Sequence, residues 1–460
     1  MSFDLFSELN SQAGCDFDLP AIVEEPARER SRPSSSRDLS RLFDHPTEIL
    51  FLDIETTGLS RYYDHVTLIG YAIGGEYGIA LAGQDPEPFL DALARACSLI
   101  TFNGSGFDLA FLEDMLGDVD WPRHHVDLRF ACRTAGLSGG QKEIERILGI
   151  ECRQGLDGVD GAAAVVLWHR YMRGDIPALR ELIEYNRADV EAMGRILDHL
   201  VSRHASPDLF RRADELRELC RRSFRRTGFA REDSILPSPP VHLRPSVGFA
   251  DLFVGTKAEN ATVVGLDLTG SAERPSGYCV LRGRDAETLT ISDDDAIVEA
   301  VLAADPDLVS IDSPLCLPVG RTRVSDDDPR RTEAGIMRVS ERILKRRGIN
   351  VYPCLIPSMQ KLTERGIALA DRIRRRGVPV IECYPGAAQD IMGIPRKGAG
   401  HEWLQLGLSE FGVRGPFTDA LPTHDELDAI TCSLVGLFHI AGRTEALCGP
   451  GEEPMMVPTL

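Results

Sequence analysis

Acidic residues at three separated places in the sequence have the types and spacing to do chemistry. Asp53 and Glu55 stand two residues apart in FLDIETTGL, and residues two apart in a strand point to the same side, so both carboxylates can enter one pocket. Asp189 lies four residues after Tyr185 in EYNRADV, and residues four apart on a helix are neighbours. Asp108 follows a glycine-containing loop in TFNGSGFDLAFL.

Crowded carboxylates of this kind favour a metal site. Their charges repel, so their pKa values rise unless cations hold them ionised, and hard oxygen ligands suit Mg²⁺ or Mn²⁺. Taken singly, Asp108 fits an aspartate that supports the start of a helix, and Asp189 fits a surface residue. Taken together, the acidic residues suggest the hypothesis of a two-metal site for phosphodiester cleavage.

The elements that must position these residues follow from the apolar pattern. Strands are predicted before helices around one sheet, which indicates an α/β layered domain over residues 46–200. The glycine pair Gly74-Gly75 marks a hairpin. The predicted elements are strands at 48–55, 66–73, 76–82 and 99–102, and helices at 86–97, from 107 and at 177–200.

Flanking segments complete the predicted organisation. Residues 1–45 are expected to be a flexible leader, 201–260 an Arg-rich helix followed by a Pro-rich linker, and 446–460 a disordered tail. A second α/β domain is predicted over 261–445. Its expected elements are strands at 262–268, 277–283, 288–292, 307–312 and 378–385, and helices at 294–304 and 424–440.

Length and composition bound the class of protein. With 460 residues the chain suggests two or three domains, and 43% hydrophobic with 27% charged residues is typical of a soluble globular protein. No run of 18 or more apolar residues occurs, and Asp4 and Glu8 stand where a signal peptide needs basic and then apolar residues, so we expect no membrane association and a cytoplasmic location. The 11 scattered cysteines include no C-x-x-C pair, which argues against a zinc or iron-sulfur site.

The net charge of -20 opposes unspecific binding of polyanions, so any contact with a nucleic acid must be local. Two basic stretches suggest such a contact, and each also fits the solvated face of an amphipathic helix. We place the phosphate contacts on the first stretch, chiefly on Arg221, Arg222 and Arg225, because its helix is expected between the two domains. The stretches comprise Arg211, Arg212, Arg217, Arg221, Arg222, Arg225 and Arg226, and Arg338, Arg342, Lys345, Arg346 and Arg347.

Three strings in the first domain resemble the DEDD group of 3′–5′ exonucleases, which share the ribonuclease H fold, and its Tyr-containing (DEDDy) subgroup. The strings are D-I-E at 53–55, N-G-x-x-F-D at 103–108 and Y-x-x-x-D at 185–189. The surroundings VDLRFACR, LWHRYMRGD and YNRADV are similar to the bacterial YprB-like branch of that group. The resemblance covers about residues 46–200.

This resemblance implies a role for each residue. Asp53 is expected to bridge two metal ions, Glu55 and Asp189 to complete the site that activates water, and Asp108 to serve the second ion. Tyr185 is expected to orient the attacking water, and Asn103 to position the loop or the terminal nucleotide. The implied cofactor is Mg²⁺ or Mn²⁺ as two ions, and the implied substrate is DNA or RNA.

The second domain carries a weaker acidic pattern. The expected metal ligands Asp267 and Asp312 end strands and Asp428 lies on the last helix, with Glu382 and Asp425 as further candidates. Beside Asp425, His424 fits a helix cap as well as a site residue. The strings GLDLTG, IDSPLCLP, ECYPGAAQ and HDELDAI resemble a predicted-nuclease family of unknown function, and the D-x-x-D-A ending resembles RuvC-type resolvases of the ribonuclease H fold.

The sequence therefore predicts two ribonuclease H-like domains and a metal-dependent nuclease, most simply a 3′–5′ exonuclease. Two alternatives stay open. Both domains can serve as a noncatalytic nucleic-acid-binding scaffold in a repair or RNA-processing complex. The second domain can instead be an actin-like nucleotide hydrolase, since GLDLTG distantly resembles the first phosphate loop of that fold, although the D-x-G order is not kept.

Overall fold

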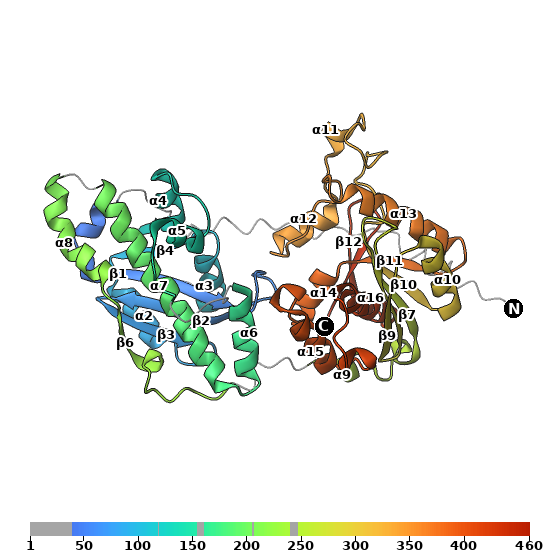
Figure 1. Cartoon of the computed structure of the whole chain (residues 1–460), viewed down its shortest axis with the longest axis horizontal. Coiled ribbons are helices and arrows are strands. Elements are labelled where there is room, and N and C mark those ends of the chain that lie inside the picture. Colours follow the sequence, from blue (N-terminus) through green and yellow to red (C-terminus); the bar gives the residue numbers. More distant parts are fainter. Residues whose placement is uncertain (1–38, 118, 154–160, 205–206, 240–246) are drawn as a thin grey trace.

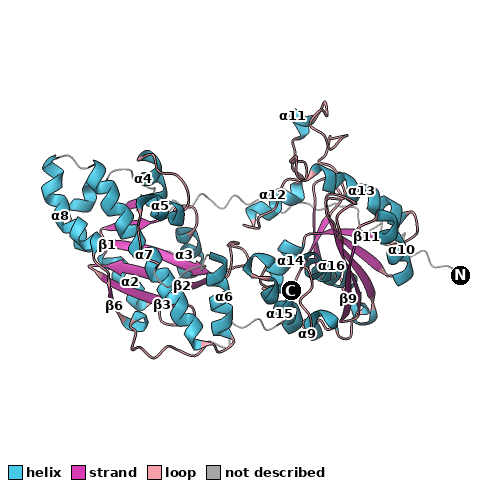
Figure 2. Ribbon diagram, in the orientation of Figure 1, coloured by secondary structure: helices cyan, strands magenta, loops and turns pink. Residues whose placement is uncertain are grey.

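The computed structural model describes residues 39–117, 119–153, 161–204, 207–239 and 247–460 (Figure 1). It contains two α/β domains side by side, each built on one mixed sheet flanked by helices (Figure 2). Most of the predicted leader 1–45 lies outside the described residues. Its last part is not a leader, because Leu42 and Phe43 are buried in the first core. Within the described residues, no helix combines the length and the apolar character needed to span a membrane.

The first sheet has the strand order β5-β4-β1-β2-β3-β6. Strands β1, β2 and β3 form an antiparallel meander, and β4 and β5 run parallel to β1 on its other side. Gly74 and Gly75 both have positive φ, as the tight turn between β2 and β3 requires, which confirms the predicted hairpin. The strands are β1 Ile49–Thr56, β2 Val66–Ile73, β3 Glu76–Leu81, β4 Ser98–Thr101, β5 His124–Asp127 and β6 Arg225–Arg226.

Helices cover this sheet, and the long helix α7 crosses the central strands β1 and β2. Its apolar face, which includes Leu179, Leu182 and Ile183, is fully buried. The helices of this domain are α2 Glu87–Arg95, α3 Asp108–Leu116, α4 Leu128–Thr134, α5 Gln141–Leu148, α6 Gly161–Met172, α7 Ile176–His204 and α8 Pro207–Arg221.

The second sheet repeats the same plan, in the order β12-β13-β11-β10-β7-β8-β9. An antiparallel meander (β7, β8, β9) is followed by the parallel strands β10 and β11 on the other side of β7. The strands are β7 Thr262–Asp267, β8 Ser276–Arg282, β9 Asp285–Ile291, β10 Leu308–Asp312, β11 Val380–Cys383, β12 Thr444–Leu447 and β13 Met455–Pro458.

The helix α16 closes the second domain as α7 closes the first. It starts at a reciprocal cap in which Thr423 and Glu426 bond to each other's backbone N–H groups at 3.0 and 3.3 Å. It packs tightly on the sheet, because a Cβ on Gly265 would meet the Ala429 carbonyl at 2.1 Å. The helices are α9 Phe249–Phe253, α10 Asp294–Ala304, α11 Arg331–Ala334, α12 Val339–Arg346, α13 Gln360–Arg374, α14 Pro385–Met392, α15 His401–Phe411 and α16 His424–Ile440.

Two predicted boundaries are corrected by the structure. The tail 446–460 is not disordered, because β13 pairs with β11 and β12 and Val457 is fully buried. The linker 201–260 is shorter than predicted, since Leu216 packs in the first core and Phe253 in the second. Apolar residues of the tail and of these flanks complete the cores, which a local composition count does not reveal.

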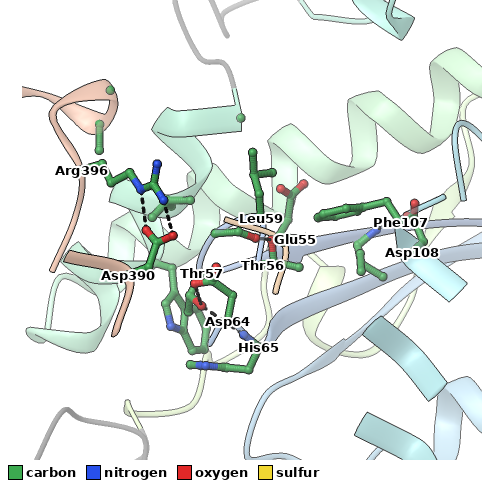
Figure 3. A pocket seen from close by; sticks show the side chains of 18 of the residues that line it. Glu55, Thr56, Thr57, Leu59, Asp64, His65, Phe107, Asp108, Asp390 and Arg396 are labelled. Atoms are coloured by element: carbon green, nitrogen blue, oxygen red, sulfur yellow. Dashed lines mark hydrogen bonds and ion pairs between the residues drawn. The ribbon is translucent and has the colours of Figure 1, made fainter. Parts of the chain in front are cut away.

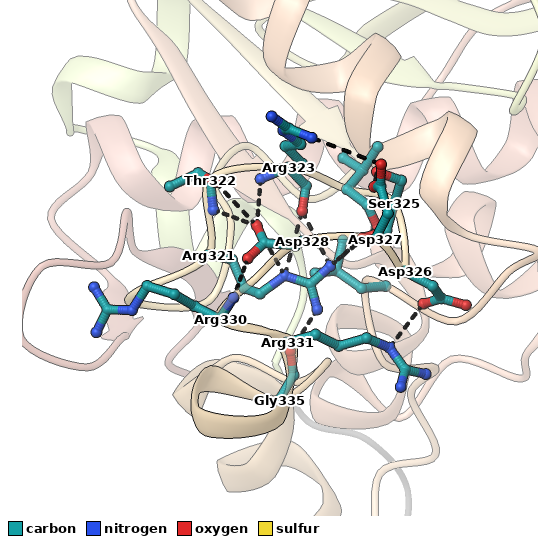
Figure 4. Close-up of polar contacts among 12 residues, drawn as sticks. Arg321, Thr322, Arg323, Ser325, Asp326, Asp327, Asp328, Arg330, Arg331 and Gly335 are labelled. Carbon is teal, nitrogen blue, oxygen red and sulfur yellow. Dashed lines mark hydrogen bonds and ion pairs between the residues drawn. The ribbon is translucent and has the colours of Figure 1, made fainter.

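The charged insertion after β10 protrudes from the second domain at α11 (Figure 1). Inside it, the Asp328 carboxylate accepts bonds from the backbone N–H groups of Thr322, Arg323 and Arg330, each at 2.7 Å (Figure 4). The fully buried Arg321 donates to backbone carbonyls of the same loop. Because both charged side chains are paired and hydrogen-bonded to the backbone, they fix the conformation of the insertion.

Among the described residues, the contacts between the domains include two sets of side-chain hydrogen bonds. In the loop 57–65 after β1, the Ser60 hydroxyl donates to the Arg347 carbonyl, and Tyr63 lies 3.2 Å from the Arg347 guanidinium. At the end of α6, the Arg173 Nε donates to Glu410 of α15 at 2.6 Å. The loop that follows the first acidic strand is therefore held by the second domain.

Candidate functional site

Three carboxylates of the first domain converge although they come from distant segments. Asp53 and Glu55 stand on the central strand β1, and Asp189 reaches them from the overlying helix α7. One oxygen of each lies within 4.8 Å of an oxygen of both others. In the described parts of the chain, no other group of three His, Cys, Asp or Glu residues is spaced closely enough to hold a metal ion. The spacing of two residues on a strand thus places both side chains on the face that α7 covers.

Asp108 joins this site from a third direction. It opens helix α3, it is 5% exposed, and its Oδ1 accepts a hydrogen bond from the Ile54 N–H at 3.2 Å. It therefore lies against the backbone between Asp53 and Glu55. Burial raises the pKa of Asp108 to about 7.

The crowding has an electrostatic cost. Burial, then repulsion from Asp189, raises the pKa of both Asp53 and Glu55 well above their usual range. A divalent cation removes that repulsion, and carboxylate oxygens are the ligands that Mg²⁺ and Mn²⁺ prefer. The donor set of this site therefore fits a divalent metal.

Asn186, which none of the sequence motifs specifies, ties two of the carboxylates together. Its Nδ2 donates to Asp53 at 2.8 Å and to Glu55 at 3.2 Å. Its Oδ1 in turn accepts from the hydroxyl of the buried Tyr77 at 2.9 Å. The fully buried position of Asn186, next to Tyr185 in the motif, is set by this chain of hydrogen bonds.

Asp189 is held by residues around α5. The Arg153 guanidinium forms an ion pair with it, and Gln141 donates to its carbonyl at 2.8 Å. Burial raises the pKa of Asp189, and Arg153 opposes that rise. Neither Arg153 nor Gln141 stands in a motif, so local sequence carried no signal for them.

Tyr185 borders the same site from α7. It is 5% exposed, and the Lys142 ammonium lies 4.9 Å from the centre of its ring. Burial, then the charge of Asp189, raises the pKa of Tyr185 above its usual value. Its hydroxyl is therefore protonated and suited to hydrogen bonding.

The loop before α3 is locally strained. Asn103 has φ of 68°, in the left-handed region that asparagine tolerates, and its N–H donates to Asp127 at 2.8 Å. Asp127 also accepts from the Ser105 N–H at 3.1 Å, and the Arg129 guanidinium donates to the Asn103 side chain at 2.5 Å. The buried Asp127 thus holds this loop in place, so that Asn103 lies at the rim of the site.

A single pocket of about 940 Å³ contains this site and is lined by both domains. Figure 3 shows Glu55 and Asp108 on one side and Asp390 and Arg396 on the other. The first domain supplies the carboxylates, Tyr185 and Asn103, while the segment 390–399 of the second domain forms the facing wall.

The second-domain residues predicted as metal ligands are only partly brought together. Asp267 and Asp312 are register partners at the ends of the parallel strands β7 and β10, and Asp428 accepts from Gln389 at 2.7 Å. Asp425 lies by His424, 2.9 Å from its ring nitrogen. They do not form a group of three with the close spacing found in the first domain, so a second metal site stays a prediction.

Glu382 has a structural role. It is fully buried, and its carboxylate accepts two hydrogen bonds from Arg338, at 2.6 and 2.7 Å, and one from the Leu315 N–H at 2.7 Å. This pairing agrees better with a structural role than with metal binding. Arg338, predicted as part of a basic surface, is fully buried with it.

The arginines predicted to contact substrate are paired with acids. Arg221 donates to Asp198 at 2.8 Å, and Arg222 and Arg225 form ion pairs with Glu218 and Glu76. Helix α8 does not lie between the domains, because it packs on α7 at the side of the first domain away from the second (Figure 1). None of the three arginines lines the pocket, so their contact with substrate stays a prediction that this placement does not favour.

Comparison with known proteins agrees with this geometry for the first domain. Residues 50–201 match the family model described as the RNase_H superfamily. A search of curated proteins gave no match.

Three solved structures are similar to parts of the chain. One, described as the apo form of the nuclease, is 22% identical over 39% of this chain and 81% of its own, with a TM-score of 0.27. Escherichia coli RNase D, an exoribonuclease involved in structured RNA processing, is 21% identical over 41% of this chain and 48% of its own, with a TM-score of 0.27. The family B DNA polymerase from the hyperthermophilic archaeon Pyrobaculum calidifontis is 14% identical over 87% of this chain and 52% of its own, with a TM-score of 0.27.

The chain thus spans about half the length of the last two proteins. The family match rests on the segment that contains Asp53, Glu55, Asp108 and Asp189. Residues 50–201 are therefore similar to proteins of the RNase_H superfamily.

Proposed function

We propose that this protein is a metal-dependent nuclease that hydrolyses phosphodiester bonds in DNA or RNA, and that it acts as a 3′–5′ exonuclease. The observation that carries the proposal is the convergence of Asp53, Glu55 and Asp189 within 4.8 Å in a pocket open to a ligand. The superfamily of the first domain supports nuclease activity. The exonuclease direction rests on the resemblance of the three motifs.

Mg²⁺ or Mn²⁺ is the proposed cofactor. Asp53, Glu55 and Asp189 would hold it, with Asp108 as the fourth carboxylate at the site. Bound divalent ions in such sites lower the pKa of water and stabilise the leaving oxygen.

The residues of the chain itself would perform the remaining tasks. Asn186 holds Asp53 and Glu55 in fixed orientations, so little reorganisation is needed when the site is loaded. The protonated Tyr185 would orient the attacking water by hydrogen bonding. Asn103, at the rim of the pocket, would contact the terminal nucleotide.

The direct test uses DNA and RNA oligonucleotides labelled at the 5′ or the 3′ end, incubated with Mg²⁺ and with Mn²⁺. We expect a ladder from 5′-labelled strands and immediate release of labelled mononucleotide from 3′-labelled ones. Asp53→Asn and Asp189→Asn should abolish cleavage, while Asp91→Asn, an exposed acid on α2, should leave it unchanged.

Two outcomes would redirect the assignment. Activity that survives Asp53→Asn but is lost in Asp267→Asn would move the chemistry to the second domain. Binding of oligonucleotides without cleavage under any metal condition would favour the scaffold alternative.

A further inference from the structure

The pocket of the proposed nuclease is not complete within its own domain. Its facing wall is formed by Gly348, Asn350 and the segment 390–399, all of the second domain. This wall supplies none of the four carboxylates of the proposed metal site. Metal binding therefore does not explain why its side chains line the pocket.

One charged pair of the wall faces the carboxylates across the pocket. Arg396 donates from Nε to Asp390 at 2.6 Å, and its Nη2 pairs with the other carboxylate oxygen (Figure 3). The Arg396 side chain is 31% exposed, so it is reachable from the pocket. Asp390 occupies the Nε and Nη2 edge of the guanidinium, and Tyr384 also forms a side-chain hydrogen bond with Arg396.

The local backbone is arranged to hold this guanidinium in place. Pro395 fixes the chain direction just before it. A Cβ on Gly386, near the start of α14, would meet Arg396 Nη1 at 3.1 Å and the Tyr384 ring at 2.9 Å, so glycine is what allows the approach. A guanidinium fixed in this way forms hydrogen bonds to an anion with little loss of side-chain entropy.

Charge balance shows why the pocket needs such a group. Its described lining includes the acids Asp53, Glu55, Asp64, Asp108, Asp189 and Asp390, and three lysine or arginine residues, Arg129, Lys142 and Arg396. Arg129 and Lys142 belong to the first domain and flank the carboxylates on α4 and α5. Arg396 is therefore the one arginine or lysine that the described part of the second domain adds to the pocket.

The size of the pocket limits what can enter it. Its volume of about 940 Å³ is near the upper limit of small-ligand sites, about 300–1,000 Å³. The two strands of a duplex lie on either side of a major groove about 12 Å wide, so a duplex is too wide for such a space. The end of one strand fits it. Phosphates of that strand would pass the second-domain wall on their way to the carboxylates.

We propose that the second domain acts as a substrate-binding wall of the nuclease site, and that Arg396, oriented by Asp390, contacts a backbone phosphate of a single nucleic-acid strand whose end lies at Asp53 and Glu55. The inference rests on the proposed function. It assigns a substrate contact to a domain whose own acidic residues do not form a close group of three.

The test measures binding separately from cleavage. In a Glu55→Gln background, which is expected not to cleave, Arg396→Ala and Arg376→Ala are compared by fluorescence anisotropy with a labelled single-stranded oligonucleotide over a range of salt concentrations. Arg376 is exposed on the same domain and outside the pocket, so Arg376→Ala removes an equal charge. We expect Arg396→Ala to raise Kd about three- to tenfold and to reduce the slope of log K against log salt by about 0.7, the value for one phosphate contact on a single strand.

Further variants separate a lost contact from a disturbed fold. Asp390→Asn combined with Arg396→Gln removes both charges and leaves no orphaned carboxylate, and it should show the same loss with an unchanged Tm. Arg396→Lys should keep the salt slope and part of the affinity. In the otherwise unchanged chain, KM should rise with kcat nearly constant, as for a contact made equally in the bound and transition states.

The possible failures are distinguishable. Equal Kd values and equal salt slopes for Arg396→Ala and Arg376→Ala would overturn the inference while leaving the proposed nuclease intact. A selective binding loss in a protein that never cleaves would keep the phosphate contact and overturn the proposed function. No binding of any strand by the unsubstituted protein would overturn both.

Discussion

Asn186 occupies the space over Gly70 that any other side chain at position 70 would fill. A Cβ on Gly70 would stand 1.5 Å from the Asn186 Oδ1, and Gly70 is the β2 partner of Asp53 in the sheet. The absence of a side chain on β2 thus lets α7 bring an amide to the carboxylates on β1.

Gly70→Ala should therefore displace Asn186 and disorder the site. We expect a loss of stability of about 1–3 kcal/mol from overpacking and at least a tenfold loss of cleavage activity. The matched control is Gly270→Ala, where the new Cβ has only ordinary contacts, the nearest at 3.7 Å. Urea unfolding and oligonucleotide cleavage check both effects, and an active Gly70→Ala protein would show that Asn186 does not need this position.

Asn186→Ala tests the amide directly. It removes the donor to Asp53 and Glu55 without adding bulk, so we expect the affinity for Mn²⁺ to fall about 10- to 100-fold, as for other residues that orient metal ligands. Isothermal titration measures this affinity. Asn260→Ala, at an exposed asparagine of the second domain, should bind Mn²⁺ as the unsubstituted protein does.

Removal of the metal should reverse which of two proteins, the unsubstituted chain or Asp53→Asn, has the higher melting temperature. In EDTA at pH 8 the crowded carboxylates repel, so Asp53→Asn should melt at a higher temperature than the unsubstituted chain. At a metal concentration of about 100 Kd the unsubstituted chain gains about 2.7 kcal/mol, and Asp53→Asn should gain much less. Melting curves that keep the same order with and without Mg²⁺ would contradict a metal site at Asp53.

Gly348→Ala tests the contact by which the second domain holds the loop after β1. Gly348 has φ of 74°, and a new Cβ would meet the Ser60 Cα at 2.9 Å across the domain boundary. Gly442→Ala is a matched control, since φ is 70° there and nothing lies within 4 Å. Both variants should lose about 1 kcal/mol from backbone strain, but only Gly348→Ala should raise KM for the oligonucleotide, because it shifts the pocket wall.

Acidification should weaken the contact between the domains at α6. Burial, then the nearby Arg173, lowers the pKa of His169 to about 4; Glu410 opposes this shift and His65 adds to it. The depressed pKa means that the unfolded chain binds the proton more readily, so this stability is present above about pH 6.5 and is lost as the pH falls toward 4.

His169→Gln removes that titration. Its free energy of unfolding should fall less steeply between pH 6.5 and 4, by at most about 1.36 kcal/mol per pH unit for one proton. Urea titrations across this range measure the difference, and superimposable pH profiles for the two proteins would contradict it.

Local residue patterns were enough to predict most of the elements and to propose the first acidic site. Apolar runs and helical periodicity located β2, α10 and α16 at the residues found, because apolar patterning is a local property of strands and helices. The spacing of Asp53 and Glu55 predicted that both carboxylates enter one pocket, since side-chain directions along a strand depend on position. Asp189 lies close to both in the structure, and the role of the three as metal ligands stays a prediction.

The groups that surround that site depend on how distant parts of the chain pack together. Asn186 acts through the space over Gly70, Arg153 reaches Asp189 from a segment without a motif, and Arg396 enters the pocket from another domain. The burial of β13 and of Glu382 with Arg338 likewise depends on partners more than 40 residues away in the chain. Contacts of this kind are set by how whole elements pack, and no window of local sequence carries that information.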